Sequence, residues 1–502
     1  MLSVCGIGAC VPFDQNFLQR TNVANVARGP DSSEVVRLDF GGLAVNRLAI
    51  SGIDFGDQPL WNQERNLAVV FNGAIYNSSD LHERFQVPSH TGNDGEIILE
   101  LYRRFGISFA DYLDGIFAIV VADVERGTLT VANDQFGVKP LYWTRSNGAV
   151  NLASTIDSFA VDQMSSLERF PPGLVWTSSG EWRRIRSLVE PSSLESFPDI
   201  VRSQIPLEVE WGCFLSGGVD SSLITALAGQ FSSQVHTFTC GTPDGSDLLA
   251  AREVAEFLGT NHHERIISVD ELPSIVSKVI RATSSFERFT VMGGVGTYLV
   301  SELAHSKGMK VVLSGEGADE LFGGYDEFQD VPYAFLNDQL EGAVMDLGST
   351  ECLRLDRCSM AHSLEARVPF LSQRLVPTIL KLDPTKKIER QSERSIRKSI
   401  LRTYAESFLP SKIAHREKVE FTVGAGVTGA LAVLAKERVS ERDVLSLQRE
   451  FPTFPIHDAL TAWFFQEWWE YVGNQLEGSW LELVDRGLFR QSANKFNQSR
   501  WL

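Results

Sequence analysis

The feature that most constrains the fold of this chain is a loop of small residues, Ser216 to Ser222, which reads SGGVDSS. The residues before it, 210–215, have the pattern of a strand end, and residues 223–228 have the pattern of a helix. Such a loop lets backbone N–H groups approach an anion, and the helix N-terminus adds partial positive charge. The Walker pattern is absent, because its second Gly-Lys-Ser/Thr element is missing. The loop therefore predicts a different anion site at the end of a strand.

Strands and helices alternate from about residue 205. Residues 235–240 predict a strand, a helix follows near 248–258, and 309–313 predict another strand that ends in a Gly-rich loop. This alternation predicts a parallel sheet with ligands at the carboxyl ends of its strands. After about residue 350 the chain is predicted to be mostly helical, and an apolar stripe of Leu460, Trp463, Phe464 and Trp468 is predicted to pack in a core.

The first 150 residues have a different pattern. Short apolar runs at 67–71, 117–121 and 128–132 predict strands, and helical spacing interrupts them at about 94–105, which is typical of an α+β layered domain. Turn-forming residues are frequent in 171–193, which we interpret as a linker region. We therefore expect one domain over residues 1–190 and a second, α/β domain over residues 200–502.

Composition limits the classes of partner. The chain has 502 residues, 43% of them hydrophobic and 22% charged, as in ordinary globular proteins. Its net charge of −18 argues against nucleic-acid or membrane partners. Six scattered cysteines without CxxC pairs predict reduced thiols. No signal-peptide pattern and no run of 18 apolar residues is found, so we expect a cytoplasmic protein.

Longer motifs accompany the Ser216–Ser222 loop. They are LSGEGADELFGGY at 313–325, MAHSLEARVPFL at 360–371, and a third segment from Leu409-Pro410 to Phe421. Together they resemble the synthetase domain of asparagine synthetases, within the ATP pyrophosphatase group, over about residues 205–425. The resemblance implies that ATP is split into AMP and pyrophosphate to activate a carboxylate.

The same resemblance implies roles for single residues. ATP or pyrophosphate binding falls to Ser216, Gly217, Gly218, Asp220, Ser221, Ser222, Ser314 and Gly315. Asp220 and Asp319 are expected to bind Mg²⁺, because carboxylate oxygens are hard ligands. Glu316 is expected to accept a proton from attacking ammonia, and Lys418 to stabilise negative charge during adenylation.

The N-terminal half carries its own ordered motifs. They are Cys5-Gly6-Ile7-Gly8, Arg28-Gly29-Pro30-Asp31, Asn46-Arg47, Asn72-Gly73, Gly92-Asn93-Asp94, DGIFA at 114–118 and NDQFGVKPLY at 133–142. In this order they resemble the class II glutamine amidotransferase domain of asparagine synthetases over about residues 5–145. The resemblance implies an N-terminal-nucleophile hydrolase with αββα layers.

Five positions would bind and cleave glutamine. Cys5 would supply the thiolate, with its own α-amine as base. Arg47 would bind the α-carboxylate, and Asp94 the α-ammonium. Asn72 and the N–H of Gly73 would form the oxyanion hole. Two other interpretations stay open: Arg47 in a surface ion pair, and Asn72-Gly73 in a plain hairpin turn.

Residues Met1 to Val4 precede Cys5, so the Cys5 nitrogen is an amide in this sequence, and an amide is not a base. Removal of a propeptide or translation from the Val4 codon would free the α-amine of Cys5. We take the second as the working hypothesis.

The acceptor of the nitrogen is a separate question. Bacterial asparagine synthetases carry an arginine, linked to aspartate binding, upstream of the SGEG loop. This chain has no Arg between Arg288 and Glu316, and the glycines at 293, 294 and 296 are expected to leave a pocket wall with little bulk. We therefore hypothesise an acceptor other than free aspartate.

The leading interpretation is an enzyme that uses ATP and glutamine to amidate a carboxylic acid. One alternative is a relative of β-lactam synthetases or peptide cyclases, which uses an internal amine; β-lactam synthetases carry Tyr where this chain has Glu316. Another is a non-catalytic binding protein with degenerate sites. A homodimer is left open.

Overall fold

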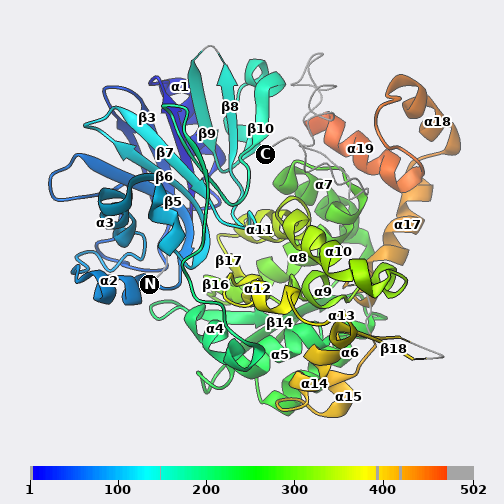
Figure 1. Ribbon diagram of the computed structural model, residues 1–502. Coiled ribbons are helices and arrows are strands. Elements are labelled where there is room, and N and C mark those ends of the chain that lie inside the picture. Colours follow the sequence, from blue (N-terminus) through cyan, green and yellow to red (C-terminus); the bar gives the residue numbers. More distant parts are fainter. Residues whose placement is uncertain (1–3, 147, 392–394, 418–420, 472–502) are drawn as a thin grey trace.

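The computed structural model describes residues 4–146, 148–391, 395–417 and 421–471 (Figure 1). Two antiparallel sheets, drawn in blue and cyan, form the N-terminal part. A parallel sheet surrounded by helices, drawn from green to orange, forms the C-terminal part. The predicted combination of an α+β and an α/β domain is confirmed.

The first sheet has the strand order β10-β8-β9-β1-β3-β2, with every neighbouring pair antiparallel. Its strands are β1 (Val4–Val11), β2 (Ser32–Arg37), β3 (Gly42–Leu48), β8 (Tyr142–Ser146), β9 (Ala149–Ala153) and β10 (Leu167–Arg169). β1 lies inside the sheet: β3 pairs with it from Val4 to Cys10, which includes Cys5, and β9 pairs with its second half, from Gly8 to Val11.

The second sheet has the order β12-β11-β7-β6-β5-β4. Its strands are β4 (Leu60–Trp61), β5 (Leu67–Ile75), β6 (Gly115–Asp123), β7 (Thr128–Asn133), β11 (Leu174–Thr177) and β12 (Trp182–Arg184). The interpretation of 171–193 as a linker was wrong, since β11 and β12 lie inside it. Trp176 and Trp182 pack edge-on against Trp143 at ring distances of 5.2 and 5.5 Å. This aromatic burial outweighs the local preference for turns.

Helices cover the outer faces of both sheets. They are α1 (Gln15–Ala24), α2 (Ser78–Phe85) and α3 (Glu96–Phe105). Alternate residues of β5 point in opposite directions: Val69 and Phe71 join the cluster under α3, whereas Ala68 and Val70 join the cluster between the sheets. Both faces of β5 are therefore buried, which explains its unbroken apolar run. The αββα layering predicted from the resemblance is confirmed.

The parallel sheet has the order β15-β14-β13-β16-β17. Its strands are β13 (Trp211–Phe214), β14 (His236–Gly241), β15 (Asn261–Ile266), β16 (Val311–Leu313) and β17 (Glu365–Arg367). The associated helices are α4 (Phe197–Ser203), α5 (Val219–Ala228), α6 (Ser246–Leu258), α7 (Leu272–Thr283), α8 (Arg288–Ser306) and α9 (Ala318–Phe322). The strands predicted at 235–240 and 309–313 and the helix predicted near 248–258 are confirmed.

The remaining part is mainly helical, as predicted. The helices are α10 (Tyr333–Asp346), α11 (Glu351–Met360), α12 (Val376–Leu380), α13 (Pro384–Lys387), α14 (Ser399–Ala405), α15 (Ser411–Ala414), α16 (Phe421–Gly424), α17 (Val427–Arg438), α18 (Glu441–Glu450) and α19 (Ala459–Tyr471), and β18 (Ile388–Arg390) pairs with β19 (Ser395–Arg397). The predicted stripe on α19 is buried core: Leu460, Trp463, Phe464 and Trp468.

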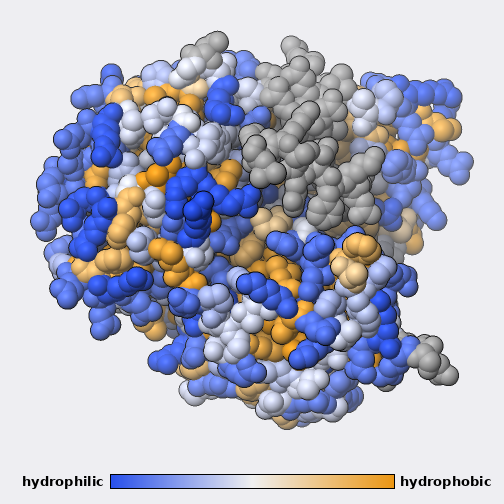
Figure 2. All heavy atoms as spheres, in the orientation of Figure 1, coloured by the Kyte–Doolittle hydropathy of each residue, from blue (hydrophilic) through white to orange (hydrophobic). Residues whose placement is uncertain are grey.

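The surface seen in Figure 2 is mostly hydrophilic, with scattered hydrophobic patches, in keeping with the charged composition. All six cysteines are free and buried. Over the residues that the structure describes, no helix combines the length and the apolar character needed to span a membrane.

A chain of buried ion pairs joins the two parts. Arg28, from the N-terminal part, donates to both carboxylate oxygens of Asp356 on α11 at 2.7 and 3.1 Å. The Nζ of Lys139 lies 3.6 Å from Asp356 and 3.4 Å from Glu365 on β17, and Arg367 donates to Glu365 at 2.6 Å. None of these five side chains is more than 4% exposed. We call them the interface ion chain.

Removing one member of the interface ion chain should destabilise the protein strongly, because it leaves buried charges without a partner. We expect Asp356→Asn to lower the free energy of unfolding by about 3–5 kcal/mol, measured by urea denaturation followed by tryptophan fluorescence. The matched control is Glu168→Gln, which removes an exposed pair with Arg145 at 3.8 Å and should change stability by less than about 1 kcal/mol. Equal effects of the two substitutions would contradict the prediction.

Candidate active sites

Cys5 lies at the start of β1, opposite Arg47 on β3, and its side chain is fully buried. The Gln58 amide nitrogen donates to the Cys5 sulfur at 3.2 Å, and the Gln58 oxygen accepts from the Phe71 N–H at 2.7 Å. Burial raises the pKa of the Cys5 thiol to about 12, although the charge of Arg47 opposes this shift. Since the Gln58 nitrogen is a donor, it cannot take the thiol proton.

Asn72 lies in the middle of β5, beside Cys5. The Asn72 side-chain amide has two possible orientations. In the first, its nitrogen donates to the Cys5 carbonyl oxygen at 2.8 Å and its oxygen accepts from Arg28 Nη2 at 3.2 Å. The opposite orientation makes one bond, from the Cys5 N–H to Oδ1 at 3.3 Å. We favour the first orientation, because a guanidinium can only donate. The hairpin-turn interpretation of Asn72-Gly73 is wrong, since both residues lie inside a strand.

Gly73 is required by the packing of β5 on β6. Its φ is +138°, and a Cβ there would lie 1.9 Å from the Ile116 carbonyl oxygen. The strand could not keep this conformation and this contact with a larger residue.

Arg47 is buried and wrapped by the loop that follows β3. Its Nη2 donates to the carbonyl oxygens of Ser51 and Gly52 at 2.9 and 2.8 Å, and its Nη1 donates to Asp57 at 2.8 Å. Its Nε is buried without a hydrogen-bond partner. The interpretation of Arg47 as a plain surface pair is wrong: the guanidinium is 3% exposed, whereas Asp57 is 66% exposed.

Asp94 is buried near the same strands. Its carboxylate accepts from the Ile75 N–H at 2.7 Å and from the Ser51 hydroxyl at 3.1 Å. Burial raises the pKa of Asp94 to about 7, against these two hydrogen bonds. Through Ser51, Asp94 shares a hydrogen-bonded network with Arg47.

The second cluster lies at the carboxyl edge of the parallel sheet. β13 and β16 are neighbours, with Cys213 opposite Leu313, so the loops that follow them lie side by side. A Cβ on Gly315 would lie 2.9 Å from the Ser221 N–H nitrogen, which shows how closely the two loops touch. The structure thus brings the predicted residues Ser216 to Ser222 together with Ser314, Gly315 and Asp319.

Within the first loop the hydroxyl groups face each other. The Ser216 and Ser221 hydroxyls are 3.1 Å apart, and the Gly218 N–H donates to Ser216 Oγ at 3.4 Å. Gly217 has a φ of +76°, and a Cβ there would meet Ala250 at 2.5 Å. The Ser222 hydroxyl is buried without a hydrogen-bond partner. The loop therefore has the small residues and polar groups of an anion site.

Two cations that the sequence did not single out complete this cluster. Lys398 Nζ lies 2.6 Å from both Asp220 and Asp319. Arg354 on α11 donates to Glu316 at 2.6 Å. Both come from segments far along the chain, and no local motif marks them. Lys418 lies outside the described residues, so its role stays a prediction.

The glycine-rich segment of α8 does not leave an open wall, so that expectation was wrong. A Cβ on Gly293 would lie 2.6 Å from Arg354 Nη1, and a Cβ on Gly294 would lie 2.4 Å from a Val279 methyl group. The glycines make room for these side chains. The Arg354 guanidinium, from α11, thus lies beside both Glu316 and Gly293.

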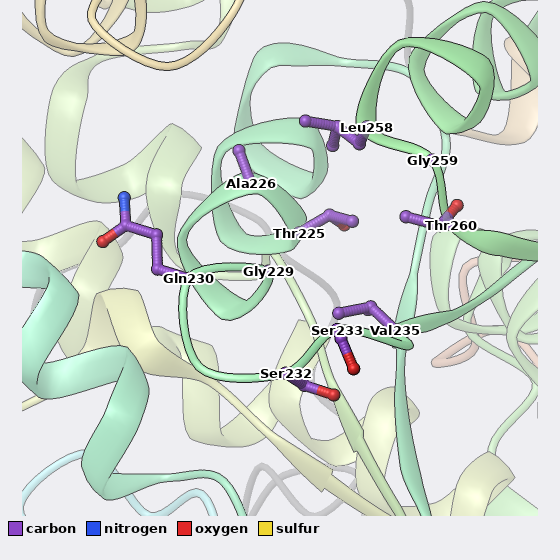
Figure 3. Close-up of a pocket in the computed structure, with 10 residues that line it drawn as sticks. All are labelled: Thr225, Ala226, Gly229, Gln230, Ser232, Ser233, Val235, Leu258, Gly259 and Thr260. Carbon is purple, nitrogen blue, oxygen red and sulfur yellow. The ribbon is translucent and has the colours of Figure 1, made fainter.

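One surface cavity, of about 280 Å³, lies away from both clusters (Figure 3). Thr225, Val235 and Thr260 point into it, and Gln230 points away. It adjoins the end of α5 and the starts of β14 and β15, and so lies at the edge of the sheet opposite to the loops.

Known proteins match both parts of the chain. The family described as asparagine synthase matches residues 194–345 and 336–467, and the glutamine amidotransferase domain matches residues 4–171. The glutamine-hydrolysing asparagine synthetase of Brassica oleracea is 33% identical over 489 residues, covering 89% of this chain and 83% of that protein. Asparagine synthetase B of Escherichia coli (strain K12) is 32% identical over 461 residues, covering 85% and 82%.

A structural comparison finds glutamine phosphoribosylpyrophosphate amidotransferase from B. subtilis, with a TM-score of 0.31 and 18% identity over 52% of this chain and 65% of that one. This likeness is too weak to bear on function.

We predict that Asp94 binds the α-ammonium group of glutamine, so glutamine should bind more weakly at low pH, because only the ionised carboxylate attracts an ammonium group. With its pKa near 7, we expect the Kd of glutamine for a Cys5→Ala variant to rise up to about tenfold per pH unit below about pH 7. Calorimetry between about pH 5.5 and 8 measures this. The control is the same variant with Asp94→Asn, which should bind weakly at every pH. A pH-independent Kd with Asp94 present would contradict the prediction.

Proposed function

This chain belongs to the glutamine-hydrolysing asparagine synthetase family, and we propose that it hydrolyses glutamine at Cys5 and uses the ammonia to amidate a carboxylate that it activates with ATP. It is a ligase with glutamine as amide donor. The observation that carries the proposal is that each half gathers its own set of reactive groups: Cys5 with Asn72, and Asp220 with Asp319.

In the first step the Cys5 sulfur attacks the side-chain carbonyl carbon of glutamine. The C–N bond then breaks, the nitrogen takes up the proton lost by the thiol and leaves as ammonia, and water hydrolyses the thioester to release glutamate. Arg47 and Asp94 hold the α-carboxylate and α-ammonium, and Asn72 with the Gly73 N–H stabilises the oxyanion. The thiol needs a base, since burial raises its pKa to about 12. We propose that the α-amine of Cys5 is this base, after residues 1–4 are removed or omitted. Intact mass of the natively produced protein tests this.

In the second step a carboxylate oxygen attacks the α-phosphorus of ATP, and pyrophosphate leaves. The loop Ser216–Ser222 and the residues Ser314 and Gly315 would hold the phosphates and AMP. Ammonia then attacks the acyl-adenylate, Glu316 takes up a proton from it, and AMP leaves. Arg354 fixes the Glu316 carboxylate by its 2.6 Å contact.

Asp220 and Asp319 fit a Mg²⁺ site. Their carboxylates converge on a single cation, and the second oxygen of Asp220 is buried without a hydrogen-bond partner. Two convergent carboxylates are the donors that Mg²⁺ prefers, and the ion would offset the phosphate charge.

The acceptor acid is aspartate or another small carboxylate. The relatives are named asparagine synthetases, which favours aspartate. The lack of an arginine between Arg288 and Glu316 favours a different acid, whereas the Arg354 guanidinium beside Glu316, at 2.6 Å, is compatible with aspartate. We also propose the division into residues 1–190 and 200–502 and a cytoplasmic location without nucleic-acid or membrane partners. The homodimer stays a prediction.

The assignment of Cys5 predicts a separation of two activities. We expect Cys5→Ala to lower glutamine-dependent AMP formation by several orders of magnitude and to keep ammonia-dependent AMP formation. The matched control is Cys10→Ala, which removes another buried thiol from the same strand and should keep both activities. Glutamine-dependent turnover in Cys5→Ala would contradict the role of Cys5.

A screen of carboxylic acids for glutamine-dependent AMP formation decides the acceptor. Saturable turnover with aspartate, and none with other acids, would refute the hypothesis of a different acceptor. If none of the acids supports AMP formation, with glutamine or with ammonia as nitrogen donor, the proposed ligase function is contradicted and a non-catalytic protein is favoured.

A further inference from the structure

Lys398 holds a position that is unusual for a lysine. Its side chain is 1% exposed, and its ammonium group bridges Asp220 Oδ2 and Asp319 Oδ1 at 2.6 Å each. Asp220 belongs to the loop after β13 and Asp319 to the helix after β16, so the ammonium group joins the two loops. A buried lysine persists when opposite charges compensate for lost hydration.

The backbone around Lys398 is built for this contact. Lys398 has a φ of +55°, a left-handed conformation that is strained in a residue other than glycine. Gly324 packs directly against the Lys398–Asp319 ion pair. A Cβ at this position would lie 1.8 Å from Asp319 Oδ1 and 2.2 Å from Lys398 Cε. The fold therefore accepts backbone strain and requires a glycine to keep the ammonium group between the two aspartates.

Arg402, another cation nearby, does not replace it. Arg402 donates to the carbonyl oxygens of Arg397, Ala414 and Arg416. Its guanidinium is thus occupied by the backbone. Lys398 is the cation seen in contact with both carboxylates among the described residues.

We propose that Lys398 keeps divalent cations out of the empty site and thereby makes metal binding depend on ATP. The inference rests on the proposed metal ligands. An ammonium group and Mg²⁺ compete for the same oxygens, and the tethered ammonium group is always present. When ATP binds, its phosphates give Lys398 another anionic partner and add oxygen ligands for the metal. Mg²⁺ then enters with the nucleotide and not before it.

Mn²⁺ binding tests this without turnover. Free Mn²⁺ is measured by electron paramagnetic resonance with the full chain, with and without a non-hydrolysable ATP analogue. For wild-type protein, we expect the Kd of Mn²⁺ to be at least about tenfold higher without the analogue than with it. We expect Lys398→Met to bind Mn²⁺ without nucleotide at least about tenfold more tightly than wild type.

The matched control is Lys412→Met. It removes the same charge from an exposed lysine that pairs with Glu253, and it should bind Mn²⁺ like wild type. Lys398→Arg, which keeps the charge, should still exclude Mn²⁺ from the empty site.

Tight Mn²⁺ binding by nucleotide-free wild-type protein would overturn the inference, and this result needs no variant to fold. Mn²⁺ binding to wild type in neither condition would overturn the proposed metal site as well. Absence of AMP formation, by contrast, would leave the Mn²⁺ results standing and count only against the proposed reaction.

Discussion

The arrangement of the two halves depends on the burial of the interface ion chain. Charges buried between domains are tolerated only when each has a partner in good geometry, because desolvation of an ion costs several kcal/mol. Arg28 and Lys139 come from one half, and Asp356, Glu365 and Arg367 from the other. Neither half can shift without separating charges in a dry environment. The pairing therefore fixes how one site faces the other.

The interface ion chain also reaches both sites. Arg28 donates to the Asn72 amide beside Cys5, and Glu365 and Arg367 lie on β17, which pairs with β16. A second set of contacts is made by residues that precede the amino ends of β13 and β16. Lys310, just before β16, donates to Asp31 and to the Ala49 carbonyl oxygen at 2.7 and 3.0 Å.

Glu208, shortly before β13, accepts from the N–H groups of Gly52 and Ile53 at 3.4 Å. Gly52 belongs to the loop that wraps Arg47. Thus β13 and β16 carry the loops that contain Ser216 and Ser314 at their carboxyl ends, and residues just before their amino ends contact the N-terminal part near Arg47.

The sequence predicted what is local and periodic. The Ser216–Ser222 loop could be placed between strand and helix because small residues, an apolar strand and an apolar helix follow in order. Lys398 and Arg354 could not be found, since their meaning comes from partners at Asp220 and Glu316, far away along the chain. The α8 glycines were misread for the same reason: their free space is filled by side chains from other helices.

Both sites solve the same electrostatic problem in the empty state. A buried carboxylate waiting for a cationic partner is unstable as a bare charge. Asp94 avoids this by holding its proton up to about pH 7, and Asp220 and Asp319 avoid it through Lys398. Under the proposed function, the arriving ligand would bring the missing charge to Asp94 and would draw Lys398 away from Asp220 and Asp319.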